Sequence, residues 1–445
     1  MKGMKRKGGR RWAAVAALLA LLALGVAVSL LFVFPLGVLP MQGNPHQTVL
    51  PQDQLLTAQQ IQQDREECIR MVEETHPYFL LEEDLVAYEA AKADYLTNTS
   101  GEMTVGDFEE VTAEYLCFFG DGHTGVRLVE TEYLNLPQMY MNGKTWLCWE
   151  GTATGVWVET IGGVPVENIY QTIERMVPAE NEMARIKNRD QRITRRGLLL
   201  RAGVEITEGQ TIVTFSDGTE ATYSFEEPEQ SVGQTADDGA INRWYMDGDV
   251  FVVDFNACND DEEWKAIVAE LKKAVEADCR KVIIDVRGNG GGNSNACTRL
   301  LNAMGMQAPQ YDVLVRYSPL ARQQRGYLRT EGQYRFRGSN APAKRNEQVK
   351  LAVLCDRYTF SSATMMCVYV RDGGHGVLVG EPSSNMPSAY GDILSFSLTH
   401  SHVNGVISHK QFIRPDENNT ERMLEMDIAI DPQAAYEAAM EWLAQ

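Results

Sequence analysis

The chain has 445 residues, of which 44% are hydrophobic and 23% charged, an ordinary globular composition with room for two or three domains. This composition excludes a long disordered or low-complexity protein. The formal net charge is −20, and the chain after residue 50 carries 35 basic against 61 acidic residues, a net charge of −26. Such an acidic excess argues against nucleic acid or anionic lipid as a ligand of that part.

A basic N-terminus precedes a long apolar stretch. Residues 1–12 hold six lysines and arginines and no acid, and the next charged residue is Asp53. As a helix, residues 13–34 would span about 33 Å, which is enough for a bilayer core. We therefore predict a cytoplasmic tail over 1–12, a transmembrane signal-anchor over 13–38 and a linker over 39–55, with the remainder exported. A cleaved signal peptide, which would give a secreted protein, is the alternative.

The segments that follow differ in their predicted secondary structure. Residues 56–128 have apolar residues at helical spacing, and Thr104 is expected to cap a helix that ends near His123. Residues 129–235 read as short strands and turns, with a hairpin at Ser216-Asp-Gly218. Residues 236–445 alternate apolar strands with helices, one of them over 262–278, which predicts an α/β core.

Eight cysteines are scattered without the C-x-x-C spacing of a zinc site. Several lie in apolar runs and are predicted to be core thiols. Export would permit disulfides, but the sequence does not give their pairing. We therefore expect neither a metal nor a cofactor.

Three loops carry residues suited to chemistry. The glycine loop 288–292 follows an apolar strand, and its amides favour either an oxyanion hole or a tight turn, because it lacks the phosphate-loop pattern. Ser361 opens an apolar helix, where it is either a nucleophile in the positive helix dipole or a simple N-cap. His123 lies between glycines and is either the base that such a serine needs or a turn histidine without a chemical role.

Five short motifs follow one another along the chain. They are Glu74-Thr-His-Pro77, Asp121-Gly-His-Thr124, Ile283-Ile-Asp-Val-Arg-Gly-Asn-Gly-Gly-Gly292, Tyr358-Thr-Phe-Ser-Ser-Ala363, and Gly380-Glu-Pro382 with Tyr390-Gly391. Together they resemble the C-terminal processing (tail-specific) serine peptidase family, in the branch nearer to the core of tricorn protease. The resemblance covers about residues 60–130 and 240–430.

The resemblance implies a role for each matching residue. It implies Ser361 as nucleophile, with oxyanion donors at Ser362 and at the turn that holds Gly290 and Gly291. The processing branch uses a lysine base where this chain has Met386, so the histidine of the tricorn-like branch, here His123, is expected instead. The family's glutamate three residues after the nucleophile is Thr364 here. The acid that would orient His123 stays open among Asp416, Glu417 and Glu425.

The fold implied is α+β and multidomain. It comprises the N-terminal transmembrane helix, a helical subdomain (56–128), a PDZ-like β-rich domain (129–235) and an α/β, ClpP/crotonase-like peptidase core (236–445). The expected function is that of a membrane-anchored, extracytoplasmic serine endopeptidase that cleaves peptides or unfolded, C-terminal protein segments through a Ser–His acyl-enzyme. Its partners would be such substrates and the membrane, with the oligomeric state open.

Two other functions stay open from the sequence. One is a catalytically inactive peptide-binding module on the same fold, which would capture exported peptides by strand addition at the PDZ-like segment. The other is a nucleotide-binding membrane protein based on the glycine loop.

Overall fold

The computed structural model describes residues 34–44, 48–82, 84–128, 132–227, 241–339 and 341–445, with a few positions between 16 and 25. The predicted tail 1–12 lies outside these residues, and so does most of the predicted signal-anchor 13–38. Among the residues that are described, no helix is both long and apolar enough to cross a membrane.

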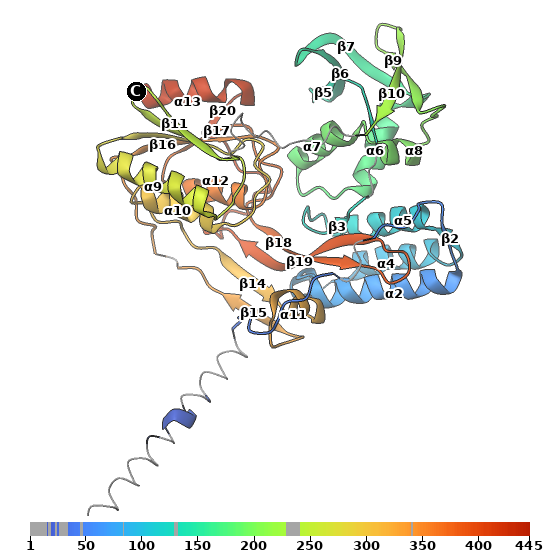
Figure 1. The fold of residues 1–445 in the computed structure, drawn as a ribbon, viewed down its shortest axis with the longest axis horizontal. Coiled ribbons are helices and arrows are strands. Elements are labelled where there is room, and N and C mark those ends of the chain that lie inside the picture. The colour runs from blue at the N-terminus through green and yellow to red at the C-terminus, as the bar shows by residue number, and fades with distance from the viewer. Residues whose placement is uncertain are drawn as a thin grey trace, which may run out of the picture.

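A sheet of mostly parallel strands lies at the centre of the C-terminal part (Figure 1). Its order is β11-β12-β13-β16-β17-β20, and each neighbouring pair from β12 onward is parallel. The central strands are apolar and largely buried, as expected where helices cover both faces. The strands are Arg243–Asp247, Val250–Asp254, Lys281–Asp285, Lys350–Cys355, Val377–Gly380 and Ile428–Ala429.

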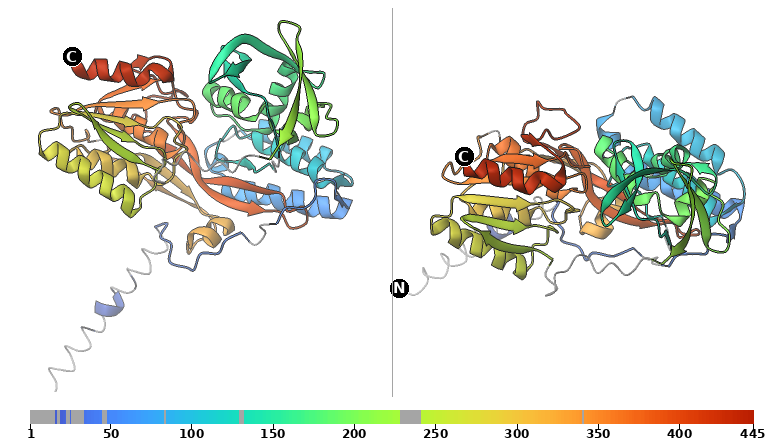
Figure 2. Two further views of the ribbon diagram at one scale, coloured as in Figure 1. Left: turned by 45° about the horizontal axis from the view of Figure 1, so that its top comes forward. Right: turned by 90° about the horizontal axis from the view of Figure 1, so that it is seen from above.

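Helices cover both faces of this sheet and confirm the predicted α/β core. On one face α9 (Glu262–Glu276), α10 (Asn295–Ala303) and α12 (Ser362–Gly373) bury the main hydrophobic cluster. On the other face lies α13 (Ala435–Ala444), preceded by a short turn, η1 (Pro432–Ala434). Figure 2 shows α9 and α13 on opposite sides of the strands. Because parallel strands end at one edge, the loops after β13 and β16 meet there.

A second sheet, β15-β14-β19-β18, extends from the core as an arm (Figure 1). Its strands are β14 (Asp312–Arg316), β15 (Gln333–Phe336), β18 (Ala389–Ser397) and β19 (Asn404–Ile413), with α11 (Pro319–Arg325) after β14. Near the tip of the arm, β3 (Gly125–Val126) pairs with β19. The loop that holds His123 directly precedes β3, so this pairing ties that loop to the arm.

The predicted helical subdomain rests on the same arm. It consists of α2 (Ala58–Thr75), α3 (Tyr78–Leu81), α4 (Val86–Asn98) and α5 (Val105–Cys117), with the strand pair β1 (Leu55–Leu56) and β2 (Met103–Thr104). The predicted cap is confirmed, because the Thr104 hydroxyl accepts the Asp107 N–H at 3.1 Å. The core of these helices includes Phe396, Leu398 and Ile407 of the arm, so the helices and the arm fold as one unit.

Residues 132–227 form a β-rich domain with its own core. Its sheet has the order β4-β10-β9-β7-β6-β5, with β8 beside β7, and α6 (Val166–Met176), α7 (Glu182–Arg192) and α8 (Arg196–Arg201) pack near it. The predicted hairpin at Ser216-Asp-Gly218 joins β9 to β10. The PDZ-like assignment of this domain stays a prediction. The strands are Tyr133–Leu134, Gln138–Met141, Lys144–Trp149, Thr152–Ile161, Val164–Pro165, Gln210–Phe215 and Glu220–Glu226.

The eight cysteines all lie within the described residues, and each is a free thiol. The sulfurs of Cys258 and Cys297 lie 3.9 Å apart without a bond between them. Most of the eight are buried, as predicted for core thiols.

Candidate active site

A cavity of about 630 Å³ lies where the core, the arm and the helical unit meet. Its lining includes Ser361 at the start of α12 and His123 from the loop after α5. These two residues are 238 positions apart in the sequence. Gly290 and Gly292 of the glycine loop line the same cavity. The three loops that the sequence singles out therefore converge on one site.

The loop between β16 and Ser361 is held by side chains of its own motifs. One carboxylate oxygen of Asp356 accepts the N–H groups of Tyr358, Thr359 and Gly288, at 2.9–3.0 Å. This carboxylate therefore ties the nucleophile loop to the glycine loop. Arg357 forms an ion pair with Glu381 of the Gly-Glu-Pro motif at 2.7 Å, which fixes the loop from the other side.

Ser361 has an unusual backbone conformation. Its φ is +54° and its ψ −124°, a region that a residue with a side chain occupies only at a cost. Although Ser361 occupies the N-cap position of α12, its side chain makes no capping hydrogen bond. Simple capping, the alternative open from the sequence, therefore does not explain this serine. The strained turn leaves the hydroxyl at the cavity and at the positive end of the helix dipole.

Gly291 lies directly against this turn. A Cβ built on it would be 2.6 Å from the Ser361 Cβ and 2.9 Å from the Ser362 nitrogen. Its φ is +99°, which also favours glycine. The glycine loop can therefore approach the nucleophile only because this position has no side chain.

The oxyanion donors differ in part from the sequence prediction. The Gly291 N–H already donates to the Asn289 Oδ1 at 2.8 Å, so this amide is not free for an oxyanion in this structure. The Ser362 N–H belongs to the first turn of α12, whose amides have no partner within the helix. Gly290 also lines the cavity. Ser362 and Gly290 stay predictions for this role, whereas the Gly291 N–H has another partner.

His123 lies in a loop that is held by a buried acid, Asp121. The Asp121 carboxylate, 1% exposed, accepts hydrogen bonds from the His123 N–H at 2.9 Å, the Thr124 hydroxyl at 2.6 Å and the Ser408 hydroxyl of the arm at 2.7 Å. The His76 ring of the Glu-Thr-His-Pro motif lies 3.2 Å from the same carboxylate. These contacts hold the loop that carries His123 against the arm.

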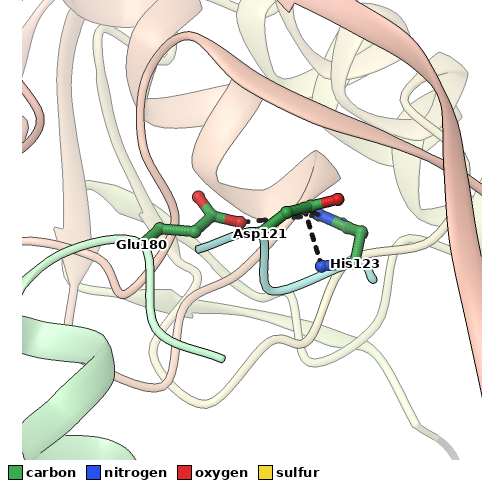
Figure 3. A group of neighbouring side chains, drawn as sticks. All are labelled: Asp121, His123 and Glu180. Atoms are coloured by element: carbon green, nitrogen blue, oxygen red, sulfur yellow. Dashed lines mark hydrogen bonds and ion pairs between the residues drawn. The ribbon is translucent and has the colours of Figure 1, made fainter. Parts of the chain in front are cut away.

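The His123 ring stacks on Phe360, the residue before the nucleophile, with 4.6 Å between ring centroids. Both ring nitrogens are buried, and neither has a hydrogen-bond partner within the described residues. The nearest acidic groups are Asp121 and Glu180, each with an oxygen 3.7 Å from Nδ1 (Figure 3). His123 is therefore placed beside the nucleophile and between two carboxylates.

The two carboxylates control the charge of His123. Burial lowers the pKa of the imidazole, but Asp121 and Glu180 outweigh it and raise the pKa from 6.5 to about 9. The two histidine contacts in turn hold the pKa of Asp121 far below its usual range, although burial opposes this. Near neutral pH His123 is thus mostly protonated in this arrangement, and the neutral form that can accept a proton gains population as the pH rises.

Asp121, His123 and Glu180 lie close together, but the carboxylates are already engaged by protein donors. One ligand atom from each of Asp121, His123 and Glu180 lies within 4.8 Å of the others. The Asp121 oxygens accept the His123 N–H and the Thr124 hydroxyl, and the Glu180 oxygens accept the Gly122 N–H and the Asn385 side-chain N–H, so the group is a hydrogen-bonded network.

Comparisons with known proteins identify the core. Residues 248–421 match Peptidase family S41, a range that includes the glycine loop, Ser361 and the arm. The core of this chain belongs to peptidase family S41. As an S41 member the chain is a serine peptidase, so the family and the enzyme class expected from the five motifs are confirmed.

The chain also resembles solved structures. Mature CPAF is 13% identical and matches 87% of this chain and 96% of its own, with a TM-score of 0.57. A structure of mature CPAF complexed with lactacystin gives the same score and identity over 87% and 97%. The photosystem II D1 C-terminal processing protease is 12% identical over 88% of this chain and 98% of its own, with a TM-score of 0.45. No curated protein matches the chain.

The positions where this S41 chain departs from the family pattern lie at the cavity. Met386 and Thr364 both line it. Lys410 lines it too, but its ammonium is 2.5 Å from the Asp392 carboxylate. Lys187, whose pKa burial lowers to about 8, donates to the Ser384 hydroxyl at 2.9 Å and not to Ser361. His123 is therefore the base that the geometry of this S41 site favours.

The three predicted orienting acids are not brought to His123. Glu425 pairs with Arg371 at 3.4 Å, near the end of α12 that is distant from Ser361. Asp416 donates its backbone N–H to Asp372, and Glu417 follows it in an exposed turn. These residues neither line the cavity nor pair with His123. The prediction relied on order along the chain, but Asp416 and Glu425 lie beside Asp372 and Arg371 at the C-terminal end of α12.

Two residues that the sequence did not single out approach the reacting groups instead. Glu180 precedes α7 of the β-rich domain, and no local pattern marks it. Asn385 accepts the Ser361 N–H at 3.0 Å through its side-chain oxygen. Asp121 could have been found, because it stands two residues before His123 in a motif that was recognised.

Proposed function

We propose that this S41 peptidase is a membrane-anchored endopeptidase that cleaves peptides or unfolded protein segments outside the cytoplasm, with Ser361 as nucleophile and His123 as base. The observation that carries the proposal is the convergence of both residues on one cavity. The strained turn at Ser361 and the amides of Gly290 and Ser362 support it further.

The mechanism follows from these placements. His123 in its neutral form removes the Ser361 proton as the oxygen attacks a peptide carbonyl, and the amides at Gly290 and Ser362 hold the oxyanion. His123 then gives the proton to the leaving amine, and water releases the acyl group by the same path. Within the described chain Ser361 Oγ is not yet hydrogen-bonded to His123, so substrate binding must draw the two together.

Membrane anchoring and export are supported by the sequence of residues 1–38. The described segment 34–44 lies along α11, where the Val38 and Leu39 N–H groups donate to the Gly326 carbonyl at 2.9 Å. A membrane anchor would thus be joined to the rest of the protein beside α11, on the arm.

The test compares the full chain with Ser361→Ala and His123→Ala in detergent, on unstructured peptides between pH 7 and 10. We expect kcat/KM to fall by at least about 10³-fold in both variants while the circular dichroism spectrum is unchanged. Lactacystin, which is complexed with mature CPAF in a solved structure, should slow peptide hydrolysis by the wild type. Peptide binding without hydrolysis in the wild type would favour the inactive peptide-binding module instead.

A further inference from the structure

Glu180 belongs to the β-rich domain, and its buried carboxylate lies in the catalytic region. It lies in the link between α6 and α7 and is only 2% exposed. A buried charge is costly unless it is paired and hydrogen-bonded. The contacts of this carboxylate therefore indicate why it is there.

One oxygen of Glu180 faces the His123 loop. Oε1 accepts the Gly122 N–H at 3.0 Å and lies 3.7 Å from the Nδ1 of His123. Asp121 lies at the same distance from Nδ1, but it belongs to the same loop as His123 and is already occupied by several donors. Glu180 is thus the nearby acid that comes from another domain.

The other oxygen of Glu180 faces the nucleophile. Oε2 accepts the Asn385 side-chain N–H at 2.6 Å and the Met386 backbone N–H at 2.7 Å. The Asn385 Oδ1 in turn accepts the Ser361 N–H at 3.0 Å. A single carboxylate therefore connects the loop of the base with the loop of the nucleophile.

The backbone around Glu180 is docked on the core. Arg422 donates to the Glu180 carbonyl, and the Asn181 side chain both caps α7 and donates to the Ser383 carbonyl at 3.2 Å. Lys187, in the second turn of α7, donates to the Ser384 hydroxyl. The position of Glu180 consequently depends on how the β-rich domain sits on the core.

We propose that Glu180 is a positioning residue of the peptidase: it orients His123 and, through Asn385, the Ser361 turn, so that docking of the β-rich domain completes the catalytic site. The proposal rests on the function proposed above. It replaces the acid that the sequence placed late in the chain.

The charge of Glu180 also favours the imidazolium that forms when His123 takes the Ser361 proton. Other ionisable groups around His123 are Asp121 with His76 behind it, Tyr390 and Asp392 of β18, Lys410 of β19, and Lys187 across the Phe360 ring. None of them joins the two loops in the way that Glu180 does.

The first test does not need activity. The Ser361→Ala chain is prepared with isotope-labelled histidine, with and without Glu180→Gln. The NMR signal of His123, which is identified by its absence in His123→Ala, is then followed as the pH is changed. We expect the pKa of His123 to fall by about 1 or more when this carboxylate becomes neutral. The matched control is Glu182→Gln, an exposed acid two residues away, which should leave the titration unchanged. A His123 titration that is the same in Glu180→Gln as in its parent overturns the proposal.

The second test measures kcat/KM against pH. In Glu180→Gln we expect a loss of roughly 10- to 100-fold, part of the 10²–10⁴ that a positioned base contributes. The pH of half-maximal activity should also move lower, because the neutral imidazole forms earlier. A loss of thermal stability with an unchanged pH profile would show a purely structural role and contradict the proposal.

Glu180→Asp is the second variant in case Glu180→Gln does not fold. It keeps the negative charge but moves it away from the His123 Nδ1. The pKa of His123 and kcat/KM should therefore lie between those of the wild type and of Glu180→Gln. Wild-type values for both quantities would count against the proposal. Hydrolysis that survives Ser361→Ala would instead refute the proposed function, and the histidine titration would still decide the role of Glu180.

Discussion

At the scale of single residues, the site depends on backbone that few side chains tolerate. Ser361 sits at φ +54° and Gly291 at +99°, and the two touch. Such strain persists only where the surroundings enforce it, here through Asp356, Glu381 and Asn385. The glycine is thus required for its missing side chain more than for its amide, which Asn289 already occupies.

Replacing Gly291 tests this steric requirement. In Gly291→Ala the new Cβ would be 2.6 Å from that of Ser361, so we expect kcat/KM below about 1% of wild type, because a shift near 1 Å at a reacting group costs about 10²-fold. Gly288→Ala is the matched control: its φ is also positive, +73°, but no atom lies within 4 Å of its Cβ. It should lose about 1–2 kcal/mol of stability and keep activity. Equal losses of activity in both variants would refute the clash.

The pH dependence of the wild type follows from His123. Because the pKa is raised to about 9, the base is protonated and inactive at lower pH, and kcat/KM should rise with pH until it levels off above about 9. The stability contribution has the opposite sign: the protonated ring stabilises the fold fully below its unfolded pKa of about 6.5, and this contribution is lost as pH rises through 9. A pH–rate profile shows whether this holds, and a maximum near pH 6 would contradict it.

At the scale of elements, the β18–β19 arm decides where the base lies. It contributes Phe396 and Ile407 to the core of the helical unit and pairs with β3 directly after the His123 loop. At its other end β18 lines the cavity through Ala389 and Gly391. The arm therefore fixes the spacing between the helical unit and Ser361.

Truncation of Phe396 tests this role of the arm. The ring is 2% exposed, so Phe396→Ala should reduce the free energy of unfolding by about 3–5 kcal/mol and lower kcat/KM as the His123 loop loosens. Phe336→Ala, on β15 of the same sheet, removes a ring that is 41% exposed and should cost under about 1 kcal/mol. Urea unfolding and peptide hydrolysis compare the two, and a similar small effect in both would contradict the proposed role of the arm.

At the scale of the whole molecule, the catalytic region is assembled from separate parts of the chain. The core supplies Ser361 and the amides, the helical unit supplies His123, and the β-rich domain brings Glu180 between them. Binding that shifts the β-rich domain would therefore reach the base and the nucleophile together.

The proposed anchor belongs to this scale as well. A chain that begins at Pro35 keeps the contacts of residues 38 and 39 with Gly326 and loses the apolar stretch. We expect it to stay in the supernatant after ultracentrifugation and to retain full peptidase activity, whereas the full chain sediments with membranes and resists alkaline extraction. Release of the full chain by alkaline carbonate, or its N-terminal trimming on export, would favour the cleaved signal peptide.

Local patterns in the sequence determined the α/β core, the capped helix at Thr104, the hairpin at residues 216–218, and the loops that hold Ser361 and His123. Periodicity, caps and turn residues act over a few positions, so they can be recognised in the sequence without knowledge of the fold. Tertiary structure decided which amide is free at the glycine loop, which acid faces His123, and that the helical unit shares its core with the arm. Glu180 and His123 are 57 positions apart and come together only through domain docking, a long-range contact that leaves no periodic trace in the chain.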